Sequence, residues 1–486
     1  MSALRVLSVA AEVYPLVKTG GLADVAGALP AALAAEDVRV VTLMPGYPAT
    51  MKALERPTVA KRYAELFGGP ARIVAGRAAG LELLALDAPH LFERHGNPYL
   101  GPDGRDWPDN AFRFAALSRA AADVARDGAG DFSPDVVHAH DWQAALAPAY
   151  LRYDGGPRPA TVLTIHNLAF QGQFPADWLA RLGLPPHAFA LDGVEYYGTI
   201  GFLKAGLQMA DRITTVSPSY AAEIMTPQGG MGLDGLLATR AADVVGILNG
   251  IDTAVWNPAG DPALTQAYSA TRLAQRDKNR VALQRRLGLA EDPQAPLFGL
   301  VSRLTTQKGV DLIVEAMPTL LSLGGQLAAL GTGDRALEGA MERAALAHPG
   351  RVGVLIGYDE ELAHLVQGGA DFLLVPSRFE PCGLTQLCAL RYGAPPLVAR
   401  VGGLADTVID ANEAAIEAGA ATGIVFSPVD AQSYAAALRR AAALHRDPAT
   451  FKRLRLNGMR ADVSWRRPAG AYARLYRDLV ATRTAR

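Results

Sequence analysis

The amino-acid sequence predicts an α/β fold of two doubly wound domains, each formed around a sheet of mainly parallel strands. Its 486 residues exceed what a single hydrophobic core ordinarily organises. Apolar runs of strand length alternate with Ala- and Leu-rich helical stretches throughout the chain. These runs are apolar at successive residues instead of every second one, which is typical of strands covered by helices on both faces.

The first half supplies one set of these elements. Strands are expected at residues 6–10, 38–43, 136–138, 161–165, 212–216 and 244–248. Helices are expected at residues 25–35, 111–124, 142–150 and 202–209. In such sheets ligands bind beyond the carboxyl ends of the strands, so the residues that follow each strand are candidates for a site.

The second half repeats the pattern. Its strands are expected at residues 298–301, 326–330, 352–356, 372–375, 396–399 and 422–425, and its helices include 310–321, 335–345 and 384–391. A turn-rich stretch from Asn249 to Pro258 separates the two sets. We therefore expect an N-terminal domain at residues 1–248, a C-terminal domain at 249–464, and a cleft between them.

Residues 465–486 are expected to form a last helix. Apolar side chains recur there at helical spacing, at Tyr472, Leu475, Tyr476, Leu479 and Val480. Such a stripe requires a surface to pack on. We expect the helix to return to the N-terminal domain, with packing on the second domain as the alternative.

Composition excludes several classes of protein. A net charge of −1 gives no sign of a nucleic-acid or anionic membrane partner. The two cysteines, Cys382 and Cys388, cannot form a disulfide framework and suit the reducing cytoplasm. Arg5 lies inside the apolar N-terminal run and Glu12 follows it, which indicates a strand and not a signal peptide. No apolar run approaches the ~20 residues of a membrane span.

The motif Lys18-Thr-Gly-Gly-Leu-Ala-Asp24 lies between the first strand and the first helix. Gly20 and Gly21 allow a ligand to approach the backbone closely because they carry no Cβ. Free amides at the helix start favour an anion, and Lys18 adds a positive charge. The motif predicts a site for a phosphorylated ligand, with an ordinary strand-to-helix turn as the alternative.

A basic pair follows the strand at 298–301, in the segment Ser302-Arg-Leu-Thr-Thr-Gln-Lys-Gly309. Arg303 and Lys308 can share one diphosphate and stabilise the charge that grows on it as it leaves. A pair of solvated loop charges is the alternative.

Another strand leads into Ser377-Arg-Phe-Glu-Pro-Cys-Gly-Leu-Thr-Gln386. Glu380 can hold sugar hydroxyls or balance nearby cations. Gly383 opens an expected helix whose start can receive phosphate, with Thr385 close by. Cys382 is interpreted as a packing residue, because nothing near it in the sequence argues for an activated thiolate.

The segment Gly331-Thr-Gly-Asp-Arg-Ala336 matches the dinucleotide fingerprint with alanine last. Taken alone it suggests a nicotinamide dehydrogenase, with Asp359 as the acidic residue beyond the next strand. The fingerprint usually follows the first strand of its domain, however, and here it follows the second. A nucleoside diphosphate would be served equally well by the same glycines.

Histidines end two strands of the first half, in His138-Ala-His-Asp-Trp142 and Thr164-Ile-His-Asn167. We expect His138 and His140 to face opposite ways, so that a metal site would lack ligands. The chain also contains no Asp-x-Asp pair to hold a diphosphate-bound metal. Hydrogen-bonded histidines are therefore expected, and no metal.

Together these motifs resemble the signatures of bacterial glycogen synthases and plant starch synthases. Four of them occur in the order of that family, and the likeness extends from Val6 to about Leu479. The resemblance implies a GT-B fold, which is two Rossmann-like domains facing a deep cleft. It also implies ADP-glucose as the donor, the non-reducing end of an α-1,4-glucan as the acceptor, and a retaining transfer without metal or other cofactor.

The resemblance also assigns roles to residues. In the first half it implies donor phosphate and glucose contacts by Lys18, Gly20, Gly21 and Asp24, and a glucose pocket lined by Asp141, His166, Asn167 and Asn249. In the second half it implies diphosphate neutralisation by Arg303 and Lys308, a helix start at Cys382, Gly383, Leu384 and Thr385, glucose contact by Glu380, and nucleotide contact by Gly331 and Tyr358. Tyr358 is expected to stack on adenine.

Two mechanisms suit these residue types. Asp141 can stabilise a sugar with oxocarbenium character while cations stabilise the departing ADP. We prefer attack on the front face within an ion pair, with the leaving phosphate accepting the proton of the acceptor. Double displacement, with Glu380 as the nucleophile, is the alternative.

Two positions depart from the pattern of the family. Related transferases often carry a second glutamate eight residues after the first, and the synthases an aromatic residue, where this chain has Cys388. The segment Val398-Ala-Arg-Val-Gly-Gly403 keeps Arg400 and the paired glycines but is otherwise a loose match.

Three other classes of protein are alternatives to this family. A phosphorylase would need a pyridoxal phosphate lysine and a longer chain. A non-catalytic glucan-binding protein would have no phosphate for Lys18, Arg303 and Lys308 to neutralise. Another nucleotide-sugar transferase of the same fold is the third. Because phosphate ligands are expected from both domains, we also expect the donor to favour closure, which excludes water.

Overall fold

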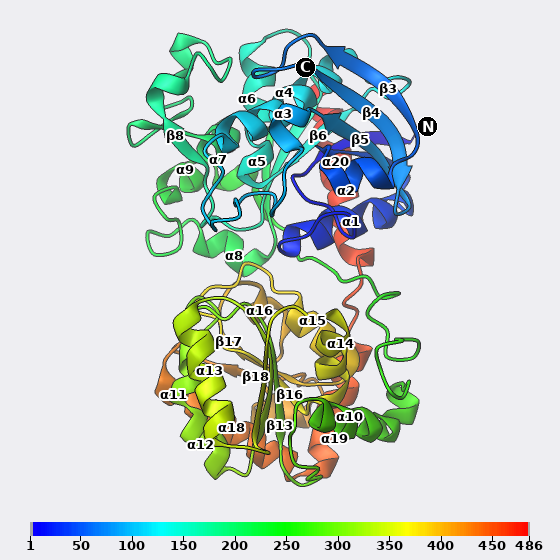
Figure 1. The fold of residues 1–486 in the computed structure, drawn as a ribbon, viewed down its shortest axis with the longest axis vertical. Coiled ribbons are helices and arrows are strands. Elements are labelled where there is room, and N and C mark those ends of the chain that lie inside the picture. Colours follow the sequence, from blue (N-terminus) through cyan, green and yellow to red (C-terminus); the bar gives the residue numbers. More distant parts are fainter. Residues whose placement is uncertain (1–2, 485–486) are drawn as a thin grey trace. The chain divides into compact units, whose positions relative to one another are not determined.

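The computed structural model describes residues 3–484 and divides the chain into two compact units (Figure 1). Unit 1 comprises Met1–Asn249 together with Trp465–Arg486, and unit 2 comprises Gly250–Ser464. Each unit is built around its own sheet, with helices on both faces. No helix within residues 3–484 combines the length and the apolar character that crossing a bilayer requires.

The main sheet of unit 1 has nine strands in the order β12-β11-β7-β6-β1-β2-β5-β4-β3. Their bounds are β1 Leu4–Val9, β2 Val38–Pro45, β3 Glu55–Tyr63, β4 Ala71–Ala78, β5 Leu81–Asp87, β6 Val136–His140, β7 Ala160–Ile165, β11 Arg212–Thr215 and β12 Val244–Gly246. Strands β12 to β5 pair in parallel, which confirms the expectation for the centre of the sheet.

The other edge of this sheet differs from the expectation, because β5, β4 and β3 pair antiparallel. None of these three strands was expected from the apolar pattern of the sequence. Strand β3 is mostly exposed and carries charged residues near both ends and a proline, so it shows no apolar run. Charged residues and proline on an edge strand discourage pairing with another chain, and they also hide the strand from a search for hydrophobic runs.

Ten α-helices are described in unit 1. Their bounds are α1 Gly21–Ala34, α2 Pro48–Ala53, α3 Pro89–Phe92, α4 Asn110–Asp127, α5 Asp141–Ala144, α6 Leu146–Tyr153, α7 Phe202–Met209, α8 Pro218–Glu223, α9 Asp234–Thr239 and α20 Arg466–Thr484. A small antiparallel sheet, in the order β8-β10-β9, is formed by Gln173–Pro175, Thr199–Gly201 and Glu195–Tyr196.

Helix α20 packs on unit 1, beside α1 and β7. Its stripe of Tyr472, Tyr476 and Leu479 is buried in one hydrophobic cluster with Val6 and Val136 of the central strands. The last helix of the chain is therefore part of the core that the first strand begins, and the red and dark blue segments lie together in Figure 1.

Unit 2 has a six-stranded parallel sheet in the order β15-β14-β13-β16-β17-β18. The strands are β13 Leu297–Val301, β14 Gln326–Gly331, β15 Val352–Ile356, β16 Phe372–Val375, β17 Pro396–Ala399 and β18 Ile424–Phe426. The helices are α10 Asp277–Arg286, α11 Val310–Glu315, α12 Met317–Ser322, α13 Arg335–Ala347, α14 Glu360–Gly369, α15 Thr385–Tyr392, α16 Gly402–Thr407, α17 Glu413–Glu417, α18 Ala431–His445 and α19 Pro448–Arg460.

Two expected helices are each divided in the structure. Residues 310–321 form α11 and α12, and Pro318 lies in the first turn of α12, where its missing N–H costs no helical hydrogen bond. Residues 142–150 are divided at Ala145 into α5 and α6.

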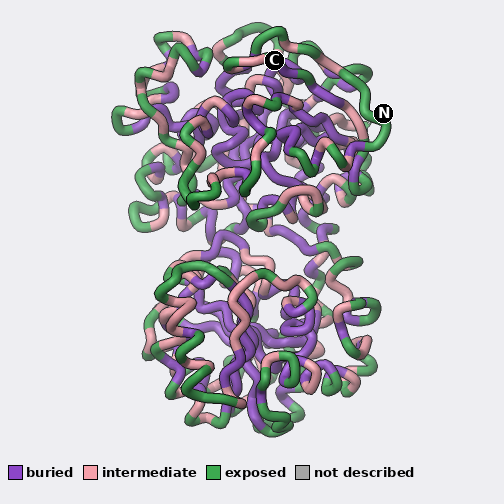
Figure 2. The backbone as a smooth tube through the Cα atoms, viewed as in Figure 1, coloured by how far each residue is buried: buried purple, intermediate pink, exposed green. Residues whose placement is uncertain are grey.

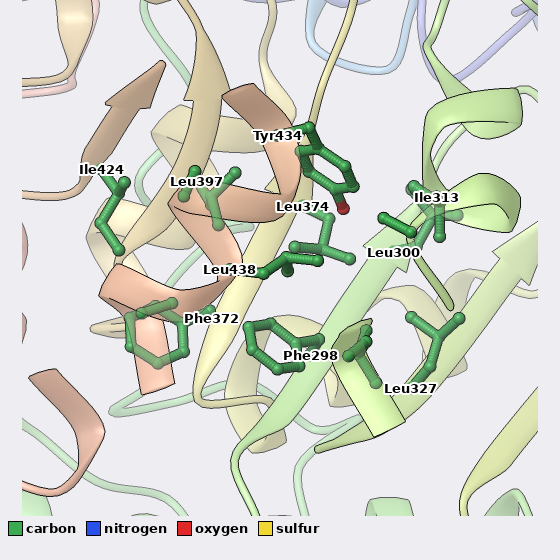
Figure 3. Packing of buried hydrophobic residues seen from close by; sticks show 14 of the residues in the cluster. Phe298, Leu300, Ile313, Leu327, Phe372, Leu374, Leu397, Ile424, Tyr434 and Leu438 are labelled. Atoms are coloured by element: carbon green, nitrogen blue, oxygen red, sulfur yellow. The ribbon is translucent and has the colours of Figure 1, made fainter. Parts of the chain in front are cut away.

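The strands form the cores of both units, as the buried colour along them in Figure 2 shows. In unit 2, Phe298, Leu327 and Phe372 on the sheet pack against Ile313 of α11 and Leu438 of α18 (Figure 3). Apolar packing on both faces holds the parallel strands in register, so the loops at their carboxyl ends start from fixed positions.

Candidate active site

The loop at residues 18–21 is organised by a buried carboxylate that the sequence analysis did not single out. Glu12 is 3% exposed, and its Oε2 accepts hydrogen bonds from the amides of Thr19 (2.5 Å) and Gly20 (3.2 Å). Its Oε1 accepts from Thr19 Oγ1 at 2.7 Å and from Tyr99 OH at 2.6 Å. Glu12 therefore holds this loop in place through hydrogen bonds and connects it to Tyr99.

This arrangement limits which amides of the motif can bind an anion. The amides of Thr19 and Gly20 are not free, because Glu12 accepts both. Helix α1 begins at Gly21 without a side-chain cap, so its first amides are the donors left for a ligand. Lys18 forms an ion pair with Asp24 at 2.7 Å, and both side chains remain partly exposed.

Packing does not explain why residue 20 is a glycine. An added Cβ would meet no atom within 4 Å, and the φ of −153° is an extended angle that any residue adopts. We therefore predict that Gly20→Ala leaves the melting temperature unchanged but raises KM for the donor about tenfold, since a methyl group would hold the ligand away from the backbone. Thermal unfolding and initial rates measure the two effects. Gly27→Ala is the matched control, because its Cβ would lie 2.5 Å from Tyr14 O and should destabilise the fold. Unchanged kinetics for Gly20→Ala would contradict the prediction.

Asp141 lies at the carboxyl end of β6 and begins α5 with a φ of +55°, an angle that is uncommon outside glycine and is adopted more readily by aspartate than by most residues. Its Oδ1 accepts from the amides of His166 at 2.6 Å and Asn167 at 3.4 Å. Burial raises its pKa from 3.8 to about 7, while these two hydrogen bonds oppose the rise and the charge of Glu12 adds to it. The structure thus brings Asp141, His166 and Asn167 together and places the Glu12 loop within electrostatic range.

The expectation that His138 and His140 face opposite ways is wrong. Residues two apart on a strand share a face, and the two ring centroids lie 4.1 Å apart. Both rings are buried, as is His166, and burial lowers the pKa of His140 to about 3 and those of His138 and His166 well below 6.5. All three imidazoles are therefore neutral at pH 7. Within residues 3–484 no group of three or more His, Cys, Asp or Glu side chains is arranged to hold a metal ion.

In unit 2 the cationic residues follow β13. Arg303 is exposed and its guanidinium makes no hydrogen bond or ion pair in the part of the chain that the structure describes. Lys308 Nζ lies 2.5 Å from Glu380 Oε2, which also accepts from Ser377 Oγ at 3.0 Å. Glu380 is 7% exposed. The guanidinium of Arg303 is thus available to a ligand, whereas the ammonium group of Lys308 is paired with the buried carboxylate of Glu380.

The loop of Arg303 packs closely on the loop after β14. Leu304 and Gly333 pair as a bridge, and a Cβ at Gly331 would lie 1.9 Å from Ser302 O. The amide of Gly333 and the hydroxyl of Thr332 donate to Glu338 at 2.7 and 2.6 Å. Because a carboxylate of the chain takes these donors, the fingerprint at Gly331 is a packing motif at this position and the geometry does not favour a dinucleotide pyrophosphate there.

The backbone of Glu380 packs against the paired glycines after β17, which the sequence keeps in a segment that is otherwise a loose match. Gly402 has a φ of +40°, and a Cβ there would lie 2.1 Å from Glu380 O. The amide of Gly403 donates to the carbonyls of Glu380 and Pro381 at 3.2 and 3.1 Å. The retained pair of glycines is the sequence signal for this contact, because only residues without a side chain allow two backbones to approach so closely.

Helix α15 begins beside these loops, with Leu384 in the capping position and no side-chain cap. Gly383 has a φ of +73°, and Gln386 Nε2 donates to the carbonyls of Cys382 and Gly383 at 2.9 and 2.8 Å. Thr385 is the first residue of the helix. The uncapped amides and the helix dipole make this a place for an anion.

The remaining candidate residues are Tyr358, Asn249 and Cys382, and Cys388 is the position that departs from the family pattern. Tyr358 follows β15 and is 77% exposed, and its hydroxyl donates to Glu360 at 2.9 Å. The amide of Gly357 donates to Gly331 O, so Tyr358 lies at the same edge of the sheet as the Gly331 loop. Asn249 is buried, and its Oδ1 finds no partner among the described residues. Cys382 and Cys388 are both buried, and Cys388 packs with Ile251 and Val463.

Comparisons with known proteins find similarity to glycogen and starch synthases along the whole chain. A family described as "Starch synthase catalytic domain" matches residues 5–239, and one described as "Glycosyl transferases group 1" matches residues 284–454. Proteins named glycogen synthase are 62% identical over 486 residues in Rhodopseudomonas palustris (100% of this chain, 99% of the relative) and 60% identical over 483 residues in Methylocella silvestris (99% and 100%).

Solved structures are similar as well. The catalytic domain of starch synthase IV from Arabidopsis thaliana, bound to ADP and acarbose, superposes with a TM-score of 0.88 at 33% identity, covering 99% of this chain and 100% of that one. A sucrose-phosphate synthase from Thermosynechococcus elongatus, at 21% identity and a TM-score of 0.61 over 99% and 100% of the two chains, shares the fold.

Proposed function

This chain belongs to the family of bacterial glycogen synthases and plant starch synthases, which are glycosyltransferases of the GT-B fold, and we propose the substrates and residues of its reaction. It is a glucosyltransferase of glycogen synthesis. The donor that we propose is ADP-glucose and the acceptor is the non-reducing end of an α-1,4-glucan. The transfer retains the anomeric configuration, releases ADP and uses no metal.

The observation that carries this proposal is the cluster at the carboxyl edge of the unit 2 sheet. The unpaired Arg303, the ion-paired Lys308 and the uncapped start of α15 all follow strands of that edge. These groups would bind the diphosphate and stabilise the charge that develops on it when the bond to glucose breaks. Unit 2 is accordingly the nucleotide-sugar-binding domain in our proposal.

Unit 1 would be the acceptor and catalytic domain. The loop around Lys18 and Gly20 and the first amides of α1 offer donors to phosphate and glucose. Asp141, held by two amides, is aligned to stabilise positive charge on the sugar, with His166, Asn167 and Asn249 as its neighbours in the glucose pocket.

Glu380 holds sugar hydroxyls in this proposal and is not the nucleophile. Its Oε2 is engaged by both Lys308 and Ser377, which stabilises the carboxylate in place and leaves Oε1 for a hydroxyl. The acceptor hydroxyl then attacks the face from which ADP departs, and a phosphate oxygen takes its proton. A covalent glucosyl-Glu380 adduct, sought with Glu380→Gln as the comparison, would overturn this assignment.

The proposed function is tested by the incorporation of labelled glucose into glycogen. ADP-glucose and UDP-glucose are compared as donors, each with and without a chelator. We expect incorporation from ADP-glucose that the chelator does not reduce. Binding of glycogen without incorporation from either donor would indicate a glucan-binding protein, and preference for UDP-glucose or dependence on metal would indicate another transferase of this fold. The cytoplasmic location stays a prediction.

We predict that Tyr358→Ala raises KM for ADP-glucose about tenfold and leaves kcat within a factor of two. The tyrosine is exposed at the edge of the sheet, and stacking on a base contributes about 1–3 kcal/mol. Initial rates at varied donor concentration measure this effect. Tyr358→Phe, which keeps the ring and removes the hydroxyl that donates to Glu360, should retain the KM of the unaltered protein. An equal loss in both variants would exclude stacking.

A further inference from the structure

Two chains of buried hydrogen bonds lie behind the glucose pocket proposed for unit 1. In the first, Ser8 Oγ of β1 lies 3.2 Å from His140 Nε2, and His140 Nδ1 lies 2.9 Å from His166 Nε2. Ser8 and His140 are 5% and 1% exposed, so neither can exchange its partner for bulk water. This chain connects the central strand of the sheet to the side chain of His166.

The second chain starts at the C-terminal helix. Tyr476 OH of α20 lies 2.7 Å from His138 Nδ1, and His138 Nε2 lies 2.5 Å from Thr164 Oγ1. Thr164 Oγ1 in turn lies 2.5 Å from Thr214 Oγ1. The two chains are neighbours, since the His138 and His140 rings are 4.1 Å apart, but no hydrogen bond between them is present in the described residues.

The direction of donation in the first chain follows from the number of partners. Among residues 3–484, Ser8 Oγ has His140 as its one hydrogen-bond partner. A buried hydroxyl that accepted there would leave its own proton unpaired, at a cost of about 1–3 kcal/mol. Ser8 therefore donates to His140 Nε2, which puts the His140 proton on Nδ1. That proton is donated to His166 Nε2, so His166 carries its own proton on Nδ1.

The same reasoning orders the second chain. His138 is the one described hydrogen-bond partner of Tyr476 OH, so the phenol donates to Nδ1 and His138 holds its proton on Nε2. His138 then donates to Thr164. The protons of the two neighbouring rings are thus on different nitrogens, Nε2 in His138 and Nδ1 in His140.

Solvent has little room to alter this order. The cavity lined by Ser8, His138, His140 and Tyr476 has a volume of about 10 Å³, at the lower limit for one water molecule. The three histidines also stay neutral, because burial lowers the pKa of each. Each imidazole therefore has one N–H, and its position is decided by the hydrogen bonds.

We propose that Ser8 and His140 are positioning residues that hold His166 in the Nδ1–H tautomer, so that His166 presents a hydrogen-bond donor to a hydroxyl or phosphate oxygen of the substrate. The role of His166 toward the substrate rests on the proposed function, whereas its tautomer does not. His166 is 9% exposed, and its Nδ1 has no partner in the described residues, as a nitrogen reserved for a ligand requires.

Nitrogen-15 NMR of protein labelled at histidine tests the tautomer directly. The His166 signals, assigned by their loss in His166→Gln, should show a protonated Nδ1 and an unprotonated Nε2. Ser8→Ala should convert His166 to a mixture of tautomers, and Ser8→Thr, which keeps the hydroxyl, should restore the original state. Tyr476→Phe is the matched control, because it should change the His138 signals and leave the His166 tautomer as it was. A protonated Nε2 of His166 in the unaltered protein would overturn the proposal even if Ser8→Ala does not fold.

Kinetics then test the consequence. Partners that orient metal-binding histidines typically contribute 10- to 100-fold, and by analogy Ser8→Ala should lower kcat about tenfold with KM for glycogen unchanged. Ser118→Ala, which removes another buried hydroxyl of unit 1, should retain activity. Equal losses in the two variants would show a merely structural effect and contradict the proposal. If the unaltered protein transfers no glucose, the proposed function fails while the NMR result still decides the tautomer.

Discussion

Replacing Asp141 with asparagine should lower kcat/KM by at least 100-fold and at the same time stabilise the folded protein above pH 7. The loss is expected because only the ionised carboxylate can stabilise positive charge on the sugar, and groups of this kind contribute about 10²–10³ in rate. The gain is expected because an amide does not have to be ionised in a buried position. Its oxygen can still accept from the amide of His166, as the carboxylate does at 2.6 Å.

The sign of the pH dependence follows from the raised pKa. An unfolded aspartate titrates near 3.8, and folding raises the pKa of Asp141 to about 7, which corresponds to about 4 kcal/mol in favour of the neutral form. The contribution of Asp141 to stability is therefore greatest below pH 4 and falls as the pH rises toward 7. The stability difference between Asp141→Asn and the unaltered protein should grow over that range. The kcat/KM of the unaltered protein should fall as the pH drops below 7.

Thermal unfolding at pH 5 and pH 8, together with initial rates, measures both effects. Asp261→Asn is the opposite control. Burial tends to raise the pKa of Asp261, but hydrogen bonds from His364 and Tyr392 outweigh it and hold the pKa below its ordinary value. Asp261→Asn should therefore lose stability at pH 8. An active Asp141→Asn variant, or a stability difference that does not change with pH, would exclude our account of Asp141.

Removal of the Arg303 guanidinium should lower kcat/KM for ADP-glucose by about 10²–10³, because the departing diphosphate loses a positive donor. Stability should change by less than about 0.5 kcal/mol, since Arg303 is exposed and no ion pair is lost in the described structure. The kcat/KM of Arg303→Lys should lie between those of Arg303→Ala and the unaltered protein, because lysine keeps the charge without the two parallel N–H donors.

Arg285→Ala is the control for loss of one exposed arginine from unit 2. It breaks a surface ion pair with Glu291, which ordinarily contributes little, and it should keep full activity. Kinetics with ADP-glucose and circular dichroism separate the two outcomes. If Arg303→Ala retained the rate of Arg285→Ala, the diphosphate assignment would be wrong.

The sequence predicted best where burial on both faces dominates. Strands β15, β16 and β17 begin and end at the expected residues, because each is a short apolar run between turns. Strand β3 was missed since its residues are exposed and charged, and helix α10 was missed since its surface is almost wholly polar. Periodicity of apolar residues cannot reveal elements that bury little.

In the candidate site, the residues that directly follow strands could be predicted from the sequence. The residues that hold the site loops in place through hydrogen bonds or ion pairs could not. Glu12 precedes the phosphate motif and belongs to no motif of its own. Its carboxylate nevertheless accepts hydrogen bonds from two amides of that loop. The pairing of Lys308 with Glu380 joins positions 72 residues apart, which no spacing rule foresees. The shared face of His138 and His140 did follow from strand geometry and was misjudged.

The place of α20 has a consequence for how the protein is made. Because Tyr472 and Tyr476 fill the core begun by Val6, unit 1 cannot complete its core until the codons of α20 have been translated. Unit 2 is contiguous in sequence, so it can finish folding before α20 has been translated and unit 1 is complete. Premature termination within the codons of α20 would therefore damage the N-terminal half of the protein and leave unit 2 intact.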